Sequence, residues 1–418
     1  MADPIEVHSC SGASAEAGTI LAGSLWTHRR RNTESASYAY AETYLSSPSA
    51  YALDPGLALR TGIQQTRNGQ ALFAAFSDSA PDRWGRNLIK RLETKRAQQA
   101  GTAVRSLSEI DFLLGVRDDL RQGALRFRAP GGGPFLAEAD LGVPALTELP
   151  ALLDLAARAE ADDAGYDELR RLVRDGSSLG GARPKAHVLD AGGNVAIAKF
   201  PSAGSDTWNV MAWEKVALDL ARGAGIRVPD STLLRIGGRS VLVIDRFDRR
   251  GDVRVGYVSA LTMLEAADGE QRSYLDIAAI IEQHSTESSA ELRELWRRIA
   301  FSVLISNTDD HLRNHGFLHA GGDAWALSPA FDLNPNPAPG TTYLSTAIDE
   351  HNTTATLDNV RAVAGYFRLD AKAVDSELVR VLTAVGQWRK IARKHGLSER
   401  ECEDMAPAFR RADSAGDG

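Results

Sequence analysis

The chain is poor in cysteine, long apolar runs and positive charge, and each shortage excludes a class of protein. Its 418 residues include two cysteines, Cys10 and Cys402, at opposite ends of the sequence and without metal-ligand spacing. Thiols this sparse suit a reducing compartment. No hydrophobic stretch approaches the roughly 18 residues that cross a bilayer, and the first residues lack the basic and apolar regions of a signal peptide. We therefore expect a cytoplasmic protein that does not bind membranes.

The net charge of −7 argues against attraction of nucleic acid to the whole surface, because phosphate binding needs clustered lysine and arginine. Two short basic runs, His28 to Arg31 and Arg410-Arg411, are better interpreted as solvated faces. The length exceeds what one hydrophobic core usually supports, which indicates two or three domains.

Changes in hydrophobic periodicity predict an α+β fold with several parts. Residues 1–128 contain short β-like runs, and a cluster of Gly and Pro at 129–134 marks either the next domain edge or a long loop. Residues 129–258 mix helix and strand patterns, and 259–411 are mainly helical. We expect residues 412–418 to form a disordered tail.

Local signals place the main elements within these parts. Ser106 and Glu109 form a candidate capping box for a helix that Gly115 ends. Apolar residues at helical spacing predict helices at 146–159, 166–174, 208–223, 261–267, 275–283, 290–305 and 371–394. Paired β-like runs around glycine-containing turns predict hairpins at 186–200, 231–244 and 316–327.

The stretch from Ser306 to Asn314 carries the clearest chemical signal. Asp309 and Asn314 stand five positions apart, the spacing by which protein-kinase catalytic loops place a base beside a magnesium-binding amide. A second carboxylate follows at Asp332. The spacing alone is weak, because Asp and Asn are common in surface turns.

The order of further residues along the chain strengthens that signal. Phosphate transfer from ATP needs a glycine loop, a strand lysine, a helix glutamate that holds this lysine, a base, and magnesium ligands. Residues of the required types occur in the required order at Gly180-Gly181, Lys199, Glu214, Asp309, Asn314 and Asp332. Each residue is ordinary by itself, and their joint order favours an ATP-dependent kinase.

Two motifs depart from common protein kinases. Phe331-Asp332-Leu333 stands where those enzymes have Asp-Phe-Gly, and Gly180 to Lys185 replaces a Gly-x-Gly-x-x-Gly loop. The sequence therefore predicts an atypical kinase-like fold, with a β-rich N-terminal subdomain, a mixed N-lobe and a helical C-lobe.

These motifs together resemble the HipA family of bacterial toxin kinases. The resemblance lies in Ser178 to Lys185, Ala198 to Pro201, Asp245 to Arg249, and Asn307 to Asn314 with Phe331-Asp332. The stretch from Ser77 to Arg86 is similar to the family's N-terminal subdomain, so the resemblance spans nearly the whole chain.

The resemblance implies roles for individual residues. Asp309 would be the catalytic base, Asn314 and Asp332 the magnesium ligands, and Ser178 the autophosphorylated serine, with Ser177 as the alternative. The residues implied to bind the nucleotide are Gly180, Gly181, Ala182, Arg183, Pro184, Lys185, Lys199, Asp245, Arg246, Phe247, His311, Asn314 and Asp332.

The resemblance also implies a biological function. It implies a Ser/Thr kinase, dependent on ATP and Mg²⁺, that phosphorylates glutamyl-tRNA synthetase and so arrests translation and growth. It implies a small HipB-like helix-turn-helix antitoxin that binds the kinase and carries most of the contact with operator DNA. The segment from Pro201 to Trp208, where the family has a substrate-facing loop, is short, which leaves tryptophanyl- or lysyl-tRNA synthetase as alternative substrates.

Three other functions stay open at this point. A pseudokinase would act only as an antitoxin-bound corepressor, and a small-molecule kinase would use the same base on a metabolite hydroxyl. A zinc enzyme would use His311, His315 and His319, which recur every four residues, but Gly316 and the following β-like run argue against a helix there.

Overall fold

The computed structural model describes residues 3–10, 18–31, 33–67, 69–137, 142–176, 181–251, 253–338, 340 and 343–416. The chain divides into two compact units. Unit 1 comprises Met1–Ser205, Val243–Val258 and His319–Asp323, and unit 2 comprises Asp206–Leu242, Ser259–Leu318 and Ala324–Gly418. The expected domain limits at 128 and 258 stay predictions. No helix among the described residues has the length and hydropathy needed to cross a bilayer.

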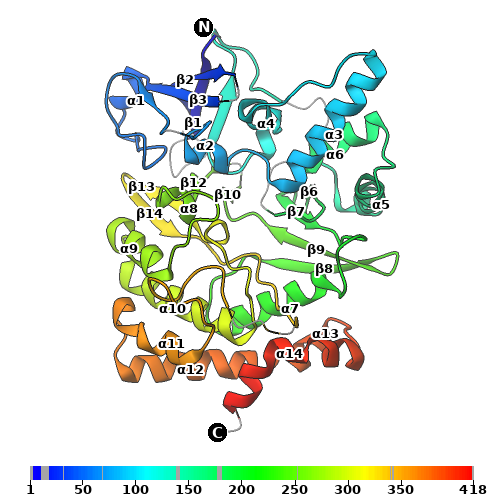
Figure 1. The fold of residues 1–418 in the computed structure, drawn as a ribbon, viewed down its shortest axis with the longest axis vertical. Helices are drawn as coiled ribbons and strands as arrows, with labels where there is room; N and C mark the ends of the chain where they lie inside the picture. The colour runs from blue at the N-terminus through cyan, green and yellow to red at the C-terminus, as the bar shows by residue number, and fades with distance from the viewer. Residues whose placement is uncertain are drawn as a thin grey trace. The chain divides into compact units, whose positions relative to one another are not determined.

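Unit 1 contains most of the strands (Figure 1). Its elements are β1 (Ile5–Cys10), β2 (Thr19–Arg30), β3 (Thr33–Tyr40), α1 (Glu42–Leu45), β4 (Gln64–Gln65), α2 (Ala74–Asp78), α3 (Arg83–Ala100), α4 (Glu109–Gly115), η1 (Asp118–Leu120), β5 (Leu125–Arg128), η2 (Leu146–Glu148), α5 (Leu149–Glu160), α6 (Tyr166–Gly176), β6 (Lys185–Leu189), β7 (Val195–Lys199), β10 (Arg249–Arg250) and β11 (Val253–Arg254). Three strands contain residues of both units: β9 (Arg239–Asp245), β12 (Tyr257–Ser259) and β13 (Gly316–Gly321).

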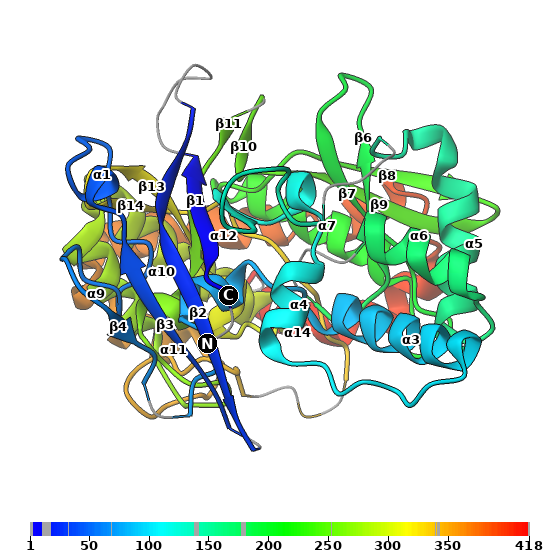
Figure 2. The ribbon, with the colours of Figure 1, turned by 90° about the horizontal axis from the view of Figure 1, so that it is seen from above.

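A five-stranded sheet with the order β4-β3-β2-β1-β5 organises the first part of unit 1. The long antiparallel strands β2 and β3 run side by side in Figure 2. The sheet buries Tyr38, whose ring packs in a T-shaped arrangement with Phe76 from α2 at a centroid distance of 5.5 Å. Phe76 in turn meets Phe127 of β5 at 6.0 Å. These aromatic contacts form the core under the sheet.

The remaining helices of unit 1 lead to the β6–β7 hairpin. α3 begins at an N-cap, Asp82, whose carboxylate accepts a hydrogen bond from the Gly85 N–H at 2.7 Å. The helix contacts α6, and α6 contacts β6 (Figure 2). The hairpin turn follows Asp190, as the sequence predicts, because its carboxylate accepts from the N–H groups of Gly192 and Asn194.

Unit 2 is mainly helical. Its elements are α7 (Val210–Gly223), β8 (Ser231–Ile236), α8 (Ala260–Met263), α9 (Tyr274–His284), α10 (Ser288–Leu304), η3 (Leu312–Asn314), β14 (Ala324–Leu327), α11 (Leu357–Ala362), η4 (Ala364–Phe367), α12 (Ala371–Val385), α13 (Trp388–Lys394) and α14 (Glu399–Gly416). α10 is buried along much of its length and contacts α9, α12 and α14 (Figure 1).

An aromatic cluster fixes the C-terminal helices of unit 2. The rings of Trp388 on α13 and Phe409 on α14 stack at 4.5 Å, and both lie against Trp213 of α7. α14 continues to Gly416, so the expectation of a disordered tail from 412 is wrong for 412–416, while 417–418 lie outside the described residues. The helix persists because Ala412 is buried and Asp413 accepts a hydrogen bond from Trp388 Nε1 at 3.2 Å.

Local conformation explains the other differences from the predicted elements. The helix expected at 261–267 ends early, because Glu265 adopts a left-handed conformation with φ +49°. The helix expected at 371–394 is divided into α12 and α13 after Gly386. The capping box of α4 uses Ser108 and Asp111 instead of Ser106 and Glu109, and Glu109 forms an ion pair with Arg86. The other predicted helices and hairpins are present.

Candidate active site

The predicted catalytic loop, Ser306 to Asn314, follows α10 in unit 2 and is called the catalytic loop below. Ser306 is completely buried and has a left-handed backbone with φ +53°. Its hydroxyl donates to the Ala408 carbonyl at 2.9 Å and accepts from Arg411 Nη1 at 2.8 Å. The C-terminal helix α14 therefore fixes the start of the loop, and backbone strain at Ser306 is held by these bonds.

Asp309 and Asn314 are brought together as the five-residue spacing predicts. Asn314 Nδ2 donates to the Asp309 carbonyl at 3.1 Å, and the His311 N–H donates to the same carbonyl at 2.9 Å. Asp309 and His311 are exposed, whereas Asn314 is buried. Because the amide nitrogen of Asn314 closes the loop, its orientation is set, and the amide oxygen is directed away from that bond.

A buried network supports the loop through Asp310, a residue that the sequence analysis did not single out. Its carboxylate accepts from the Tyr274 hydroxyl at 2.5 Å and the Ser302 hydroxyl at 3.2 Å, and His315 Nε2 lies 3.1 Å away. Burial would raise the pKa of Asp310, but these neighbours outweigh it and hold the pKa below its ordinary value. Thr346 also donates to the Asp310 carbonyl at 2.6 Å.

The segment that carries Asp332 is bonded to the catalytic loop. The N–H of Asn334 donates to Asn307 Oδ1 at 3.3 Å, and Asn336 Nδ2 donates to Thr308 Oγ1 at 3.0 Å. Asn334 Nδ2 also donates to Asp332 Oδ1 at 3.3 Å. Asp332 has a left-handed backbone with φ +58°, a conformation that Asp tolerates better than most residues. Asn307 and Asn334 were not predicted, because nothing in their spacing shows that they meet.

The side chains of this loop suit a hard divalent cation. Mg²⁺ prefers oxygen ligands, and the carboxylate of Asp332 and the amide oxygen of Asn314, the two predicted ligands, supply them. Beside them, Asn334 Oδ1 is buried and has no hydrogen-bond partner among the described residues. An acceptor left in this state is costly unless a cation or water compensates it. The residues therefore fit the magnesium site that the sequence predicts.

The predicted phosphate loop and strand lysine lie in unit 1, and Ser177, Ser178 and Gly180 lie outside the described residues. Lys185 begins β6 and Lys199 ends β7, and the two are direct partners in the antiparallel register. The Phe200 N–H donates to the Pro184 carbonyl at 2.9 Å, which extends the pairing toward the loop. The structure thus brings these two lysines together.

The remaining phosphate-loop residues, Gly181 to Arg183, also belong to unit 1. Gly181 and Ala182 are exposed, and Arg183 is half-buried. Gly181 has φ +111°, a conformation that favours glycine, so this position requires the residue that the motif supplies.

The predicted nucleotide-binding residues Asp245 to Phe247 lie in unit 1 and begin at the last residue of β9. Asp245 is exposed and Phe247 is half-buried. Arg246 is buried, and its guanidinium forms a bidentate pair with Asp248 and donates to the Leu120 carbonyl at 2.6 Å. The Arg246 side chain is therefore committed to the protein interior, a role that the sequence analysis did not foresee.

Glu214, the predicted partner of Lys199, lies on α7 in unit 2 and is 1% exposed. A carboxylate buried to this extent needs a compensating charge or hydrogen bond. Its pairing with Lys199 stays a prediction.

The three histidines considered for zinc have different surroundings. His311 is exposed, His315 lies beside Asp310, and the His319 ring stacks on Tyr51 at 3.8 Å. No group of three or more His, Cys, Asp or Glu side chains with metal-binding geometry is present in the described part of the chain.

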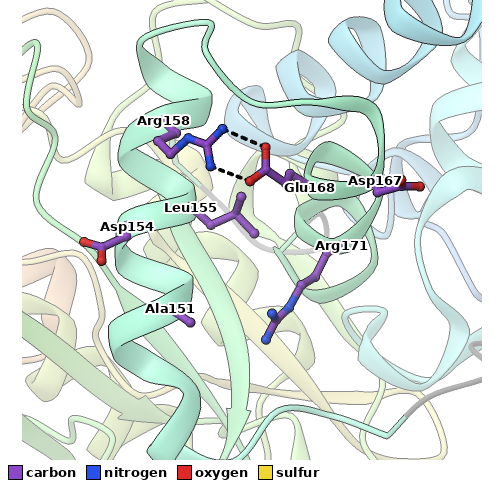
Figure 3. Close-up of a pocket in the computed structure, with 7 residues that line it drawn as sticks. All are labelled: Ala151, Asp154, Leu155, Arg158, Asp167, Glu168 and Arg171. Atoms are coloured by element: carbon purple, nitrogen blue, oxygen red, sulfur yellow. Dashed lines mark hydrogen bonds and ion pairs between the residues drawn. The ribbon is translucent and has the colours of Figure 1, made fainter. Parts of the chain in front are cut away.

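A groove of about 420 Å³ lies between α5 and α6 in unit 1 (Figure 3). Arg158 and Glu168 form a bidentate ion pair across it, and Asp154, Asp167 and Arg171 add charges of both signs. The residues that line it include none of the predicted site residues. Its mixed charges select no class of ligand.

Comparison with known proteins identifies the family. The model of the HipA-like C-terminal domain matches residues 177–415, more than half of the chain. The chain belongs to the HipA-like C-terminal domain family. This match confirms the family that the sequence motifs indicate, and it includes the catalytic loop, Lys199 and Asp332.

Two curated relatives of this HipA-like chain are named as putative kinases. One, from Haemophilus influenzae, is 30% identical over 29% of this chain and 39% of its own length. The other, Y4dM of Sinorhizobium fredii, is 29% identical over 42% of this chain and 50% of its own length. The chain thus spans about half or less of the curated relatives that it matches.

A solved structure shows the same fold over almost the whole chain. A chain in the complex of HipA, HipB and operator DNA from Shewanella oneidensis MR-1 aligns with a TM-score of 0.68 and 16% identity, covering 98% of this chain and 97% of that chain. The predicted α+β fold of the atypical kinase type is therefore confirmed.

Proposed function

We propose that this HipA-like protein is an ATP- and Mg²⁺-dependent serine/threonine kinase and the toxin of a HipBA-like toxin–antitoxin system. The observation that carries the proposal is the hydrogen bonding of Asn334 to both Asn307 and Asp332, which joins the second carboxylate to the catalytic loop. The naming of two relatives as putative kinases supports it.

The residues of the catalytic loop would transfer the γ-phosphate of ATP to a substrate hydroxyl. Asp309, exposed at the loop surface, accepts the proton of a substrate hydroxyl. The hydroxyl oxygen bonds to the γ-phosphorus of ATP while the bond to the β-phosphate oxygen breaks, and ADP leaves. Asn314 and Asp332 would hold Mg²⁺, which neutralises phosphate charge when bound.

Other predicted residues would bind and orient ATP. The residues from Gly180 to Lys185 would enclose the phosphates, and Lys199, positioned by Glu214, would bind the α and β phosphates. His311 would line the nucleotide site from the catalytic loop. The backbone of Asp245 to Phe247 would meet the adenine, since the Arg246 side chain is engaged by Asp248.

The proposed substrate is an aminoacyl-tRNA synthetase. Glutamyl-tRNA synthetase is the first candidate, and the tryptophanyl- and lysyl-tRNA synthetases are the alternatives. Phosphorylation of the synthetase would stop translation and growth. Autophosphorylation at Ser178, with Ser177 as the alternative, would inactivate the kinase. A HipB-like antitoxin would bind it and provide the main contact with operator DNA. The presence of HipA, HipB and operator DNA together in the Shewanella complex supports this partnership.

Expression in a bacterium without the antitoxin tests the biological part of the proposal. We expect growth arrest by the wild-type protein, rescue by overexpressed target synthetase, and no arrest by Asp309→Asn. Equal arrest by both proteins would refute toxicity through phosphate transfer. Antitoxin-dependent repression without any arrest would instead indicate a corepressor.

A further inference from the structure

A buried ion pair lies at the end of the phosphate loop in unit 1. The Lys185 ammonium pairs with Oδ2 of Asp82, and the two side chains are 3% and 6% exposed. The other oxygen of Asp82 caps α3 by accepting from the Gly85 N–H at 2.7 Å. One oxygen of the Asp82 carboxylate thus binds the start of α3, and the other binds Lys185, a residue of the predicted nucleotide site.

The strand register shows why the charge of Lys185 needs compensation. Lys185 and Lys199 stand directly opposite each other in the antiparallel β6–β7 hairpin. Opposite residues of such a pair project from the same face, and like charges placed there repel each other. Asp82 compensates the Lys185 charge, so the hairpin can keep a second cation at Lys199.

The same contacts hold the end of the loop. Lys185 Nζ donates to the Gly181 carbonyl at 3.1 Å, and the Trp84 N–H, in the first turn of α3, donates to that carbonyl at 3.4 Å. Gly181 is therefore held from two directions, both of which depend on the position of Asp82.

We propose that Asp82 is a positioning residue of the nucleotide site. It holds the Lys185 side chain, which anchors the end of the phosphate loop at Gly181, and Lys199 is the lysine that contacts the phosphates. This inference rests on the proposed kinase function. Asp82 precedes the residues matched by the family model, 177–415, so the inference gives the region before 177 an indirect role in ATP binding, through Lys185.

The charges of Asp82 and Lys185 lead us to expect different effects from replacing either residue alone. Burial raises the pKa of Asp82, and the Lys185 charge lowers it. When Lys185 is replaced by Met, Asp82 can take up a proton and stay buried as a neutral acid. When Asp82 is replaced by Asn, the buried Lys185 ammonium loses the charge of Asp82 while it stays opposite Lys199, which is unfavourable.

Binding of a fluorescent ATP analogue, in the presence of Mg²⁺ and competed with ATP, tests the inference in the full-length chain. We expect Asp82→Asn to weaken ATP binding about tenfold or more, and Lys185→Met to weaken it less. Adding Lys185→Met to Asp82→Asn should restore most of the lost ATP affinity. Lys199→Met should remove ATP binding both in the wild-type protein and in this double variant. Asp82→Glu should retain part of the affinity, because it keeps the charge.

An ion pair between α3 and α4 provides the matched control. Glu109 and Arg86 form a bidentate pair with distances of 2.7 Å, and Arg86 lies in the first turns of α3. Glu109→Gln removes a charge pair from this helix without touching Lys185, so ATP affinity should change less than about twofold. Circular dichroism and thermal melting of each variant establish that it is folded.

The outcomes separate this inference from the proposed function. If the wild-type chain does not bind ATP, the kinase proposal itself is wrong. If the wild type binds and the double variant loses as much affinity as Lys199→Met, Lys185 contacts the phosphates and the inference is wrong. Should Asp82→Asn fail to fold, the comparison of the double variant with Lys199→Met still decides between these results.

Discussion

Replacing Tyr274 by Phe tests whether the buried network around Asp310 holds the catalytic loop. Tyr274 is completely buried, and its hydroxyl donates to Asp310 Oδ2 at 2.5 Å. A hydrogen bond to a charged group contributes about 1.5–3 kcal/mol. Because Phe keeps the aromatic ring and its packing, we expect the free energy of unfolding to fall by about that amount.

Thermal unfolding at pH 7 measures this loss, because the lowered pKa of Asp310 keeps its carboxylate charged there. For a domain of 150–250 residues, about 1 kcal/mol shifts the melting temperature by roughly 2–4 °C, so a decrease of roughly 3–12 °C is expected. Asp309 immediately precedes Asp310 in the chain. A displacement of about 1 Å at a reacting group can reduce the rate roughly 10²-fold. We therefore also expect kcat to fall more than the KM for ATP rises.

Tyr366→Phe is the control for Tyr274→Phe. Tyr366 is 65% exposed, so the same oxygen is removed from a solvated position. The control should change neither the melting temperature nor kcat by a measurable amount. If the two variants unfold at the same temperature and have the same kcat, the Asp310 network does not support the catalytic loop, and this reasoning is wrong.

Two further predictions concern other polar contacts of unit 2. Asn334→Ala removes the amide that orients Asp332, and residues behind metal ligands typically contribute 10–100-fold, so the Mg²⁺ concentration at half-maximal activity should rise about 10-fold or more. An unchanged Mg²⁺ dependence would contradict this role. Burial opposes ionisation of Asp219, but His395 and Lys215 lower its pKa to about 2. Because this pKa lies below the unfolded value, Asp219→Asn should destabilise the protein at pH 7, and the difference should disappear as pH falls from about 4 to 2. A pH-independent difference in melting temperature would contradict the assignment.

Features with a local cause were predictable from the sequence. The β6–β7 hairpin follows from the turn after Asp190, and α7 follows from apolar residues at helical spacing. The Asp309–Asn314 pair was also predictable, because one side chain closes a loop of only a few residues.

Features that join distant segments were not predictable. Asp82 meets Lys185 across 103 positions, and Ser306 meets the Ala408 carbonyl across 102. No periodicity or spacing reports such contacts, because they depend on how completed elements pack. The burial of Asp310 was hidden for the same reason, since a neighbouring Asp309 of identical chemistry is exposed.

Transfer of labelled phosphate from ATP is the most direct test of the central claim. Purified wild-type protein and Asp309→Asn would each be incubated with labelled ATP, Mg²⁺ and a panel of aminoacyl-tRNA synthetases. We expect label on one synthetase with the wild-type protein, and a reduction of at least roughly 10²-fold with Asp309→Asn. Equal labelling by both proteins, or no label on any synthetase or on the protein itself, would contradict it.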